Sequence, residues 1–401
     1  MAVVRSYVTI MISEEEARAK ILETVRPLPS RSVPVLDALN CFAAEEYGAR
    51  LPLPSFDNSA MDGYAVIAED CRPGARLRVI SEQPAGVDRQ LQLSTGTTVR
   101  IFTGAPMPAN SDAVVMQEDV TREENEIAVN AAVYPGQYIR SRECDLAAGQ
   151  KILGAGERIR ATTLALLTSQ GFESVSVGAE ARVAIISTGD ELAKPGEPLR
   201  AGQIYESNSV LLRSLLQGCG AVSVSTQQCA DDRDSLRRAF TGSVKNQIVI
   251  VNGGVSVGEH DLVQTTLRSL GARIDIWQVA IKPGKPFLFG RLGDCLIFGL
   301  PGNPVSAFVT FLQFVRPAIL KLMGAGTLEL STVPAKLIVD LTNESDRPHY
   351  IRGKIEAGNF APVGRQESHA LFSLSQSNAL VRVEVGESLK AGAIVSVQVW
   401  D

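Results

Sequence analysis

The segment from 181 to 324 alternates buried-strand patterns with helix patterns, and this alternation limits the possible fold more than any other feature of the chain. VAIIS at 183–187 and QIVIVN at 247–252 are typical of buried strands. Between such strands lie helix patterns with polar caps and glycine stops, as in SNSVLLRSLLQGCG at 207–220. The pattern predicts a doubly wound, mostly parallel α/β sheet. In open sheets of this kind, ligands bind outside the carboxyl ends of the strands.

Four loops rich in glycine and proline lie where these strand patterns end. They are STGDE at 187–191, NGGVSVGEHD at 252–261, KPGKP at 282–286 and LPGNP at 300–304. Glycine lacks the Cβ that would keep an anion away from the backbone N–H groups. Two of the loops also carry carboxylates, so the leading hypothesis is a site that holds both phosphate oxygens and a divalent cation.

Other parts of the chain have different patterns. Ser13 and Glu16 predict a capping box that opens a helix ending near Thr24. Residues 45–140 form short alternating runs separated by Pro and Gly, which predicts a small β-rich unit. Strand patterns resume from about 331 to 401, where we expect a small barrel or sandwich.

The composition limits the classes of partner. The chain has 401 residues and a formal net charge of −5, and no basic stretch is interleaved with aromatics, so we expect no nucleic-acid binding. The longest apolar runs, such as IVIV at 248–251, are much shorter than a membrane span, and no signal-peptide pattern opens the chain. We therefore expect no membrane contact and a cytoplasmic location. The six cysteines never form C-x-x-C, so reduced thiols are expected.

Carboxylates at the strand ends are candidate metal ligands. Glu191 lies in the first loop, Asp231 lies at the next strand-to-helix turn and Asp261 follows the GGVSVG loop. Hard oxygen ligands from separate strand ends suit Mg²⁺, which shares its octahedron between carboxylates, phosphates and water. The structural alternative is that Asp231, Asp232 and Asp261 only cap helices, and we favour it for Asp232.

Two loops carry candidate anion contacts. In KPGKP, prolines restrict the backbone around Lys282 and Lys285, so these lysines lose less entropy when they bind a tetrahedral oxyanion. In LPGNPVS, Asn303 and Pro304 begin a helix whose free N–H groups attract anions. The alternatives are a solvated turn for the lysines and a structural turn for Pro301.

A hydrolase is the sharpest competing interpretation. GVSVG at 254–258 has the nucleophile-elbow spacing around Ser256, and His349 and His369 follow later in the chain. No His-Gly-Gly-Gly element is present, and the hydrolase leaves the lysine and acidic loops unexplained. Walker A and G-x-G-x-x-G motifs are absent.

Eight motifs in one order carry a family resemblance. They are FDNSAMDGYAV, IFTGAPMP, STGDEL, QIYESN, GGVSVGEHD, IKPGKPF, GLPGNPVSAF and a final unit with YIRG and RQESH. Together they resemble the molybdopterin molybdenumtransferase family, which includes the gephyrin E domain, and the similarity covers residues 11–401. The resemblance implies an enzyme that inserts molybdate into adenylylated molybdopterin, cleaves the pyrophosphate linkage with Mg²⁺ and releases AMP.

The resemblance also implies a set of site residues. The family's catalytic positions match Asp62, Thr103, Glu191, Asp231, Asp261, Lys282 and Lys285, of which Glu191, Asp231 and Asp261 would hold the metal. Its substrate-binding positions match Asp145, Ser256, Pro301, Asn303, Pro304, Ser306, Arg352 and Ser368. Two departures stand out: Glu143-Cys144 replaces the family's Gly-Glu before Asp145, and Glu259 replaces an aspartate.

The family's architecture gives further expectations. It implies an elongated chain of four domains: a discontinuous domain at 11–45 and 141–180, an inserted β-rich domain at 46–140, an α/β domain at 181–330 and a C-terminal β-barrel domain at 331–401. It also implies a homodimer, with the molybdopterin adenylyltransferase and the recipient molybdoenzymes as partners. A non-enzymatic scaffold would tolerate loss of the site residues, and nearly all of them are present here, so catalysis is favoured.

Overall fold

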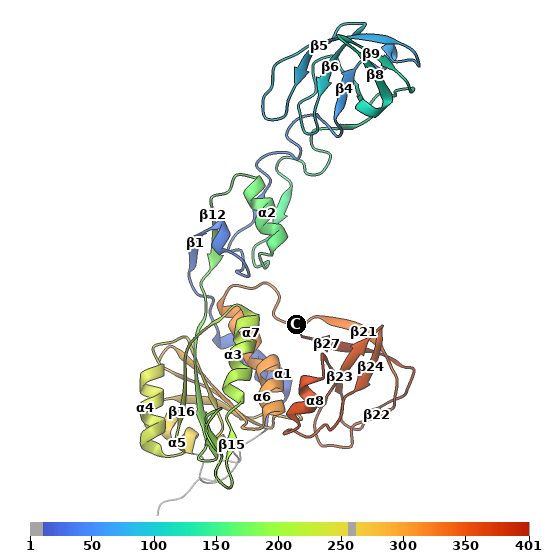
Figure 1. The fold of residues 1–401 in the computed structure, drawn as a ribbon. Coiled ribbons are helices and arrows are strands. Elements are labelled where there is room, and N and C mark those ends of the chain that lie inside the picture. Colours follow the sequence, from blue (N-terminus) through green and yellow to red (C-terminus); the bar gives the residue numbers. More distant parts are fainter. Residues whose placement is uncertain (1–10, 256–261, 401) are drawn as a thin grey trace, which may run out of the picture. The chain divides into compact units, whose positions relative to one another are not determined.

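The structure, a computed structural model, describes residues 11–255 and 262–400. The chain divides into two compact units, which we describe separately (Figure 1). Unit 1 contains the residues up to Glu45, Ala155–Arg160 and the residues from Ser174 onward. Unit 2 contains Glu46–Gly154 and Ala161–Glu173.

A six-stranded sheet forms the centre of unit 1. Its order is β16-β13-β17-β20-β19-β18; the first four strands are parallel and the last two antiparallel. The strands are β13 (Arg182–Thr188), β16 (Val222–Cys229), β17 (Ile248–Asn252), β18 (Arg273–Gln278), β19 (Pro286–Leu292) and β20 (Cys295–Leu300). The prediction of a mostly parallel sheet is confirmed, with the hairpin 286–300 as its antiparallel part.

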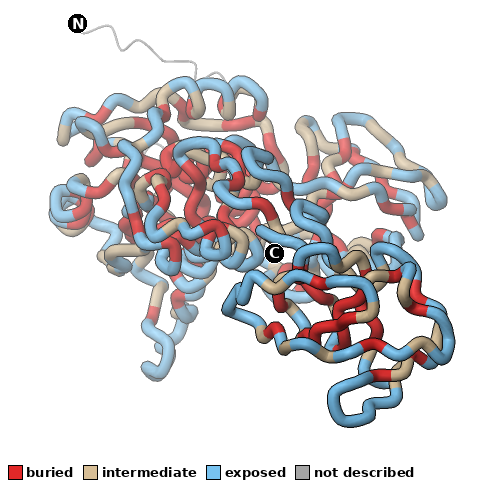
Figure 2. Tube along the Cα trace, turned by 90° about the horizontal axis from the view of Figure 1, so that it is seen from above, coloured by how far each residue is buried: buried red, intermediate tan, exposed pale blue. Residues whose placement is uncertain are grey.

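Helices cover both faces of this sheet. Along β17, Ile248 and Ile250 belong to one apolar core while Val249 and Val251 belong to the other, because successive side chains of a strand point to opposite faces. Figure 2 shows this buried centre. The helices are α1 (Glu14–Thr24), α3 (Asn208–Cys219), α4 (Arg233–Ser243), α5 (Leu262–Ser269), α6 (Pro304–Thr310) and α7 (Arg316–Leu322). Such two-sided coverage is the doubly wound arrangement.

The last two of these helices are continuous through a π-helical turn at Phe311–Val315. The stretch Pro304–Leu322 is long and apolar enough to cross a membrane, contrary to the expectation that every apolar run is too short. However, 89% of it is buried inside the protein. Its apolar character is therefore that of a core helix.

The first helix begins as the sequence predicts. The Ser13 side chain accepts a hydrogen bond from the Glu16 backbone N–H, and the Glu16 carboxylate accepts one from the Ser13 N–H. A separate antiparallel pair joins β1 (Ser30–Pro34) to β12 (Ser174–Gly178), which are far apart in the chain. A short 3-10 turn, Val35–Asp37, directly follows β1. A second small pair, β14 (Leu192–Ala193) and β15 (Ile204–Tyr205), follows the first strand of the sheet.

A closed five-stranded barrel ends unit 1, as the strand patterns after 331 predict. Its order is β21-β24-β23-β25-β27, and its interior is apolar. The strands are β21 (Thr332–Leu337), β23 (His349–Glu356), β24 (Asn359–Pro362), β25 (Ala379–Val383) and β27 (Ile394–Val399); β22 (Leu341–Thr342) pairs with β26 (Ser388–Leu389), and α8 is Leu371–Ser375.

Unit 2 is β-rich, as expected. Its main sheet has the order β7-β4-β6-β5-β9-β8 and encloses an apolar core around Tyr64 and Leu77. The strands are β4 (Gly63–Val66), β5 (Arg76–Gln83), β6 (Thr97–Ile101), β7 (Ala113–Met116), β8 (Val120–Glu123) and β9 (Glu126–Val129), with 3-10 turns at Ala68–Asp70 and Gln117–Asp119. The remaining elements are β2 (Tyr47–Gly48) paired with β11 (Lys151–Leu153), β3 (Asn58–Ser59) paired with β10 (Ile139–Arg140), and α2 (Ala161–Ser169).

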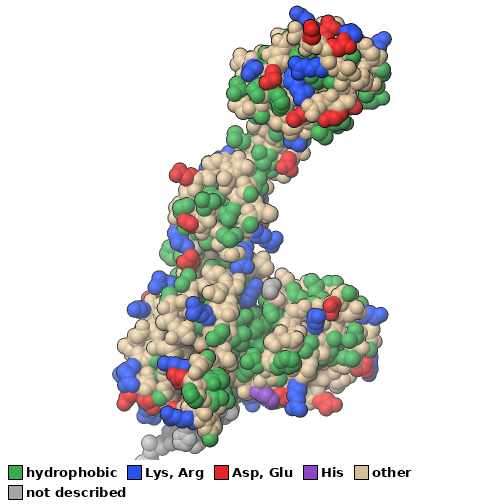
Figure 3. Space-filling model, viewed as in Figure 1, with side chains coloured by type: hydrophobic (Ala, Val, Ile, Leu, Met, Phe, Trp, Pro, Cys, Tyr) green, Lys and Arg blue, Asp and Glu red, His purple; other side chains and the backbone are tan. Residues whose placement is uncertain are grey.

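The cysteines and the surface charges agree with the composition. All six cysteines are free thiols, and burial raises the pKa of Cys219 to about 11 and that of Cys295 to about 12. Basic and acidic side chains are mixed on the face shown in Figure 3. The family's four-domain division with its residue boundaries stays a prediction.

Candidate functional site

A cavity of about 600 Å³ lies at the carboxyl ends of the parallel strands in unit 1. Thr188 at the end of β13, Asn252 at the end of β17 and Pro301 directly after β20 all line it. This is where ligands bind in open α/β sheets. We call it the acidic cavity because the carboxylates among its lining residues are Glu191, Glu206 and Asp231.

Two glycines allow the loops around this cavity to approach one another. A Cβ on Gly253 would lie 2.3 Å from the Thr188 carbonyl oxygen. A Cβ on Gly254 would lie 2.9 Å from a methyl group of Val263, and both glycines have positive φ, at 89° and 64°. Only glycine fits both the space and the left-handed backbone at these positions.

Hydrogen bonds hold the carboxylates of two neighbouring loops together. The Thr188 hydroxyl donates to Asp231 Oδ1 over 3.3 Å, and the Asp231 backbone N–H donates to Asp190 Oδ1 over 3.2 Å. The Glu191 carboxylate folds back over Gly189, where a Cβ would lie 2.6 Å from one of its oxygens. The structure therefore brings Glu191 and Asp231 to one cavity wall, as the sequence predicts.

Asp232 has the structural role that the sequence favours. Its carboxylate accepts a hydrogen bond from the Ser235 backbone N–H over 2.9 Å and so caps α4. The same bond is the main cause of its lowered pKa. Asp232 is not among the residues that line the acidic cavity.

Glu206 is a functional candidate that the sequence analysis missed. It is 9% exposed and lines the acidic cavity. Its carboxylate accepts hydrogen bonds from the Ser187 hydroxyl over 3.2 Å, from the Ser209 backbone N–H over 2.8 Å and from the Ser209 hydroxyl. The motif QIYESN, in which Glu206 lies just before a helix cap, was the available signal.

A second cavity, of about 400 Å³, adjoins the first. Lys282, Lys285 and Ser306 of the α/β part line it together with Ser368 of the barrel part. Both lysines are half-buried, and Ser306 is 4% exposed. We call it the basic cavity. The structure thus brings together the lysine loop, Ser306 and Ser368, which are separate in the sequence.

The sequence analysis also missed Arg347, which lines the basic cavity. Its Nη1 is buried and has no hydrogen-bond partner, and its Nε forms a 3.4 Å ion pair with Asp346. A buried, unpaired guanidinium nitrogen costs free energy unless a ligand accepts its hydrogen bond. Arg347 lies just before a motif that drew attention to Arg352 instead.

Arg352 has a different environment from the one the resemblance implies. Its side chain is fully buried and lines neither cavity. The guanidinium donates hydrogen bonds to the backbone carbonyls of Arg365, Gln366 and Glu367. Arg352 therefore holds the loop before Ser368 through Nη1 and Nη2, while its buried Nε has no hydrogen-bond partner, and its role as an oxyanion contact stays a prediction.

Pro301 and Asn303 line both cavities, while Pro304 lines the acidic cavity alone. Asn303 Nδ2 donates to the Ser368 hydroxyl over 3.0 Å, and the Val305 N–H donates to the Ser368 carbonyl over 3.1 Å. Asn252 Nδ2 donates to the Pro301 carbonyl over 2.8 Å. The LPGNP loop is thereby fixed between the sheet and the barrel, at the boundary of the two cavities.

Three predicted residues belong to unit 2. Asp62 and Thr103 lie together: the Thr103 N–H and hydroxyl both donate to Asp62 Oδ1, over 2.7 and 2.8 Å, and these bonds lower the pKa of Asp62. Asp145 is exposed, and the preceding Glu143 has a φ of 66°. Glu143, which stands at the family's glycine position, therefore has a left-handed backbone of the kind that glycine adopts readily.

Some predictions lie outside the described residues. These are Ser256, Glu259 and Asp261, so neither the hydrolase nucleophile nor the third candidate metal ligand is placed. Of the hydrolase histidines, His369 lines the acidic cavity. His349 is buried with no hydrogen-bond partner at Nε2, and burial together with Lys282 and Arg352 lowers its pKa to about 4.

The site can also be tested against the chemistry of a metal ion. Within residues 11–255 and 262–400, no group of three His, Cys, Asp or Glu side chains is arranged to hold one. Glu191 and Asp231 nevertheless contribute carboxylates to one wall. Two carboxylates suit Mg²⁺, which keeps several waters and takes its other ligands from phosphates.

Three family models match the chain. They are the MoeA N-terminal region (domain I and II) over residues 12–171, the probable molybdopterin binding domain over residues 184–321 and the MoeA C-terminal region (domain IV) over residues 334–400. The second of these spans the α/β part that carries both cavities' strand-end loops, and the third spans the barrel.

Curated relatives and solved structures agree with these matches. The chain is 36% identical to the molybdopterin molybdenumtransferase of Haemophilus influenzae, with 97% of this chain and 98% of the relative covered. It is 34% identical to molybdopterin molybdenumtransferase 2 of Mycobacterium tuberculosis, with 98% and 100% covered. A crystal structure of the molybdopterin biosynthesis moeA protein from Pyrococcus horikoshii OT3 has a TM-score of 0.80 at 29% identity, with 98% and 100% covered. The chain therefore belongs to the molybdopterin molybdenumtransferase family of enzymes.

Proposed function

We propose that this protein transfers molybdenum from molybdate to adenylylated molybdopterin, with Mg²⁺-dependent cleavage of the pyrophosphate linkage and release of AMP. The observation that carries the proposal is the pair of adjoining cavities in unit 1. Carboxylates line one, three cations and the single carboxylate Glu367 line the other, and Pro301 and Asn303 line both. A substrate that carries a pyrophosphate and accepts a metal oxyanion needs both environments side by side.

The basic cavity would bind the oxyanion. Lys282, Lys285 and Arg347 supply positive charge, and hydrogen bonds between charged groups are stronger than those between neutral groups. Ser306 and Ser368 add hydroxyl donors on the same wall. A doubly negative tetrahedral ion such as molybdate is satisfied by such a set of donors, whereas a neutral ligand would leave the charges uncompensated.

The acidic cavity would hold the metal and the pyrophosphate. Glu191 and Asp231 would bind Mg²⁺, with Asp261 as a third candidate in the loop outside the described residues. When bound, Mg²⁺ would neutralise charge on the phosphate oxygens and so favour departure of AMP. The protein's own contribution is to orient the ion through these carboxylates, with Asp231 held in place by the Thr188 hydroxyl.

The proposal extends to unit 2 and to assembly. Asp62, Thr103 and Asp145 would complete the site from unit 2, in a homodimer whose active site lies between protomers. We further propose a cytoplasmic location, with the molybdopterin adenylyltransferase and the recipient molybdoenzymes as partners. A measurement of mass in solution tests the dimer, and a monomer would contradict a site shared between protomers.

The decisive experiment measures two products of one reaction. The purified chain is incubated with adenylylated molybdopterin, molybdate and Mg²⁺, and both released AMP and molybdenum bound to molybdopterin are quantified. We expect Lys285→Ala to reduce molybdenum transfer about 10-fold to 100-fold, the effect of losing one charged hydrogen bond. Glu191→Ala should reduce AMP release by a similar factor, because it removes a metal ligand.

Lys354→Ala is the matched control for the lysine. Lys354 lies on the barrel surface, is 52% exposed and pairs with Glu356, so its loss should leave both products unchanged. If Lys285→Ala and Glu191→Ala both retain wild-type molybdenum transfer, the proposed function of these cavities is wrong.

A further inference from the structure

The backbone of Lys282 is held by the residues at the start of β23 in the barrel. The Lys282 N–H donates to the Pro348 carbonyl over 2.9 Å, and the Tyr350 N–H donates to the Lys282 carbonyl over 2.7 Å. These bonds form a parallel bridge between Lys282 and His349. The position of the Lys282 side chain at the basic cavity therefore depends on where the residues around Tyr350 lie.

The residues just before Lys282 are held by the N-terminal segment. The Ala280 N–H donates to the Ile12 carbonyl over 2.8 Å, and the Ile12 N–H donates to the Gln278 carbonyl over 3.4 Å. Helix α1 begins two residues after Ile12, at Glu14. The strand that leads to the lysine loop thus contacts the start of α1 first and the barrel next.

A buried side-chain hydrogen bond joins these two supports to each other. The Tyr350 hydroxyl donates to Glu14 Oε1 over 2.6 Å, and the two residues are 2% and 4% exposed. Burial raises the pKa of Glu14, although the Tyr350 bond and the nearby arginines act in the opposite direction. A buried carboxylate costs free energy that an apolar residue at this position would not. A role in positioning would explain why it is there.

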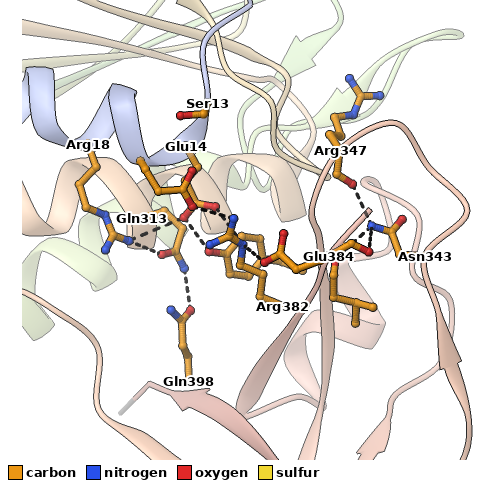
Figure 4. A network of polar contacts seen from close by, with 12 residues as sticks. Ser13, Glu14, Arg18, Gln313, Asn343, Arg347, Arg382, Glu384 and Gln398 are labelled. Carbon is orange, nitrogen blue, oxygen red and sulfur yellow. Dashed lines mark hydrogen bonds and ion pairs between the residues drawn. The ribbon is translucent and has the colours of Figure 1, made fainter. Parts of the chain in front are cut away.

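Figure 4 shows the charged groups around Glu14. Arg382, which lies directly opposite Tyr350 in the register of β23 and β25, approaches Glu14 to 3.7 Å and Glu15 to 2.7 Å. On the other side, Arg18 Nη2 lies 3.7 Å from Glu14 and donates to Gln313 Oε1 over 2.8 Å. Helix α1, the long core helix and the barrel therefore meet at this carboxylate.

We propose that Glu14 and Tyr350 are positioning residues for Lys282: their hydrogen bond fixes the two segments that hold the lysine loop and thereby sets where the Lys282 ammonium lies in the basic cavity. The inference rests on the proposed role of Lys282 as an oxyanion contact. Neither residue touches the oxyanion. Their effect is on its affinity, because a small displacement of a charged donor weakens the hydrogen bond that it makes.

The test is calorimetric titration of the full chain with molybdate alone. Tyr350→Phe and Glu14→Ala each break the hydrogen bond, and we expect each to raise the molybdate Kd about fivefold to tenfold. Glu14→Gln keeps an acceptor oxygen for the Tyr350 hydroxyl, so its Kd should stay within about twofold of wild type. Glu15→Gln is the control, since it removes an exposed ion pair of the same Arg382 and should leave the Kd unchanged.

A merely structural role gives a different result. It would lower the midpoint of thermal unfolding in Tyr350→Phe without changing the molybdate Kd of the folded protein, and that outcome would overturn the inference. A Glu14→Gln protein that binds as weakly as Glu14→Ala would overturn it too.

A double-mutant cycle separates this inference from the proposed function. If Lys282→Ala binds molybdate as tightly as wild type, then the role of Lys282 itself fails, and the inference falls with it. If Lys282→Ala binds weakly while Tyr350→Phe binds normally, only the inference fails. If the inference holds, adding Tyr350→Phe to Lys282→Ala changes the Kd by less than about twofold, because the two residues act on one contact.

Discussion

The two cavities of unit 1 are built in different ways. Residues at or just after the ends of the parallel strands form much of the acidic cavity, as with Thr188 at the end of β13 and Asn252 at the end of β17, and the barrel part adds His369 and Leu371. The basic cavity needs two separate structures, because its lysines come from a loop of the α/β part and Ser368 comes from the barrel part. The carboxylates of the first all come from the α/β part, whereas the cations and hydroxyls of the second come from both parts, so the second depends more on how two cores dock. The variants below test this difference.

Arg352→Ala should have the largest effect, on stability. The substitution removes a fully buried guanidinium and leaves three part-buried backbone carbonyls, of Arg365, Gln366 and Glu367, without their donor. Each unsatisfied group costs about 1–3 kcal/mol, so we expect a loss of at least about 3 kcal/mol. Urea unfolding followed by the fluorescence of Trp277 and Trp400 measures it; the ring centroid of Trp400 lies 4.9 Å from that of Phe308. An unchanged midpoint would show that this arginine does not hold the wall of the basic cavity.

His349 should make the stability of the barrel side depend on pH. Its pKa falls from 6.5 to about 4 because of burial first and then because of Lys282 and Arg352. Since the folded pKa is the lower one, the stabilisation is complete above pH 6.5 and is lost as the pH falls toward 4, by at most about 3 kcal/mol. His349→Asn should reduce this loss between pH 6.5 and 4. An identical pH profile in the variant would assign the loss to other groups.

Arg347→Ala should separate binding from stability. The guanidinium has a buried Nη1 without a partner at the basic cavity, so its removal should cost little stability. The KM for molybdate should rise about 10-fold to 100-fold, as expected for one charged hydrogen bond. Arg365→Ala is the control, because that side chain is exposed. Equal KM values in the two variants would exclude Arg347 from the oxyanion site.

Asp231→Asn should act only on the acidic cavity. Asparagine keeps an acceptor for the Thr188 hydroxyl but loses the charge that a cation needs. We expect the Mg²⁺ concentration that gives half-maximal AMP release to rise by up to about 10-fold. The molybdate Kd should stay unchanged. If both values change together, the two cavities are not independent, and the comparison between them loses its basis.

Local patterns predict much of the fold. The alternation of strands and helices indicated the sheet, and Ser13 with Glu16 indicated the start of α1, because these features depend on near neighbours in sequence. Local strand patterns also indicate the antiparallel hairpin 286–300, and they indicate a small barrel or sandwich where the structure has the closed barrel. The π-helical turn at Phe311–Val315 was not, because it depends on packing around an otherwise regular helix.

The candidate site was predictable in part. Glu191, Asp231 and the two lysines lie in loops whose composition signals them, and the structure brings them to two adjoining cavities. Arg347 carries no such local signal, since its significance comes from a buried nitrogen without a partner, whereas Glu206 lies in a motif, QIYESN, that the sequence analysis did not use for it. For Arg352, a motif alone cannot tell whether an arginine faces a ligand or the backbone, so its role as an oxyanion contact stays a prediction.

The long helix from Pro304 to Leu322 has a consequence for how the chain is made. It leaves the ribosome before the barrel that contacts it, and the partners of Phe308 and Gln313, namely Trp400 and Gln398, are synthesised later. Until then, part of a stretch apolar enough for a lipid bilayer has nothing to cover it. In this interval the nascent chain therefore exposes apolar surface that the finished barrel covers, and such exposed surface favours aggregation.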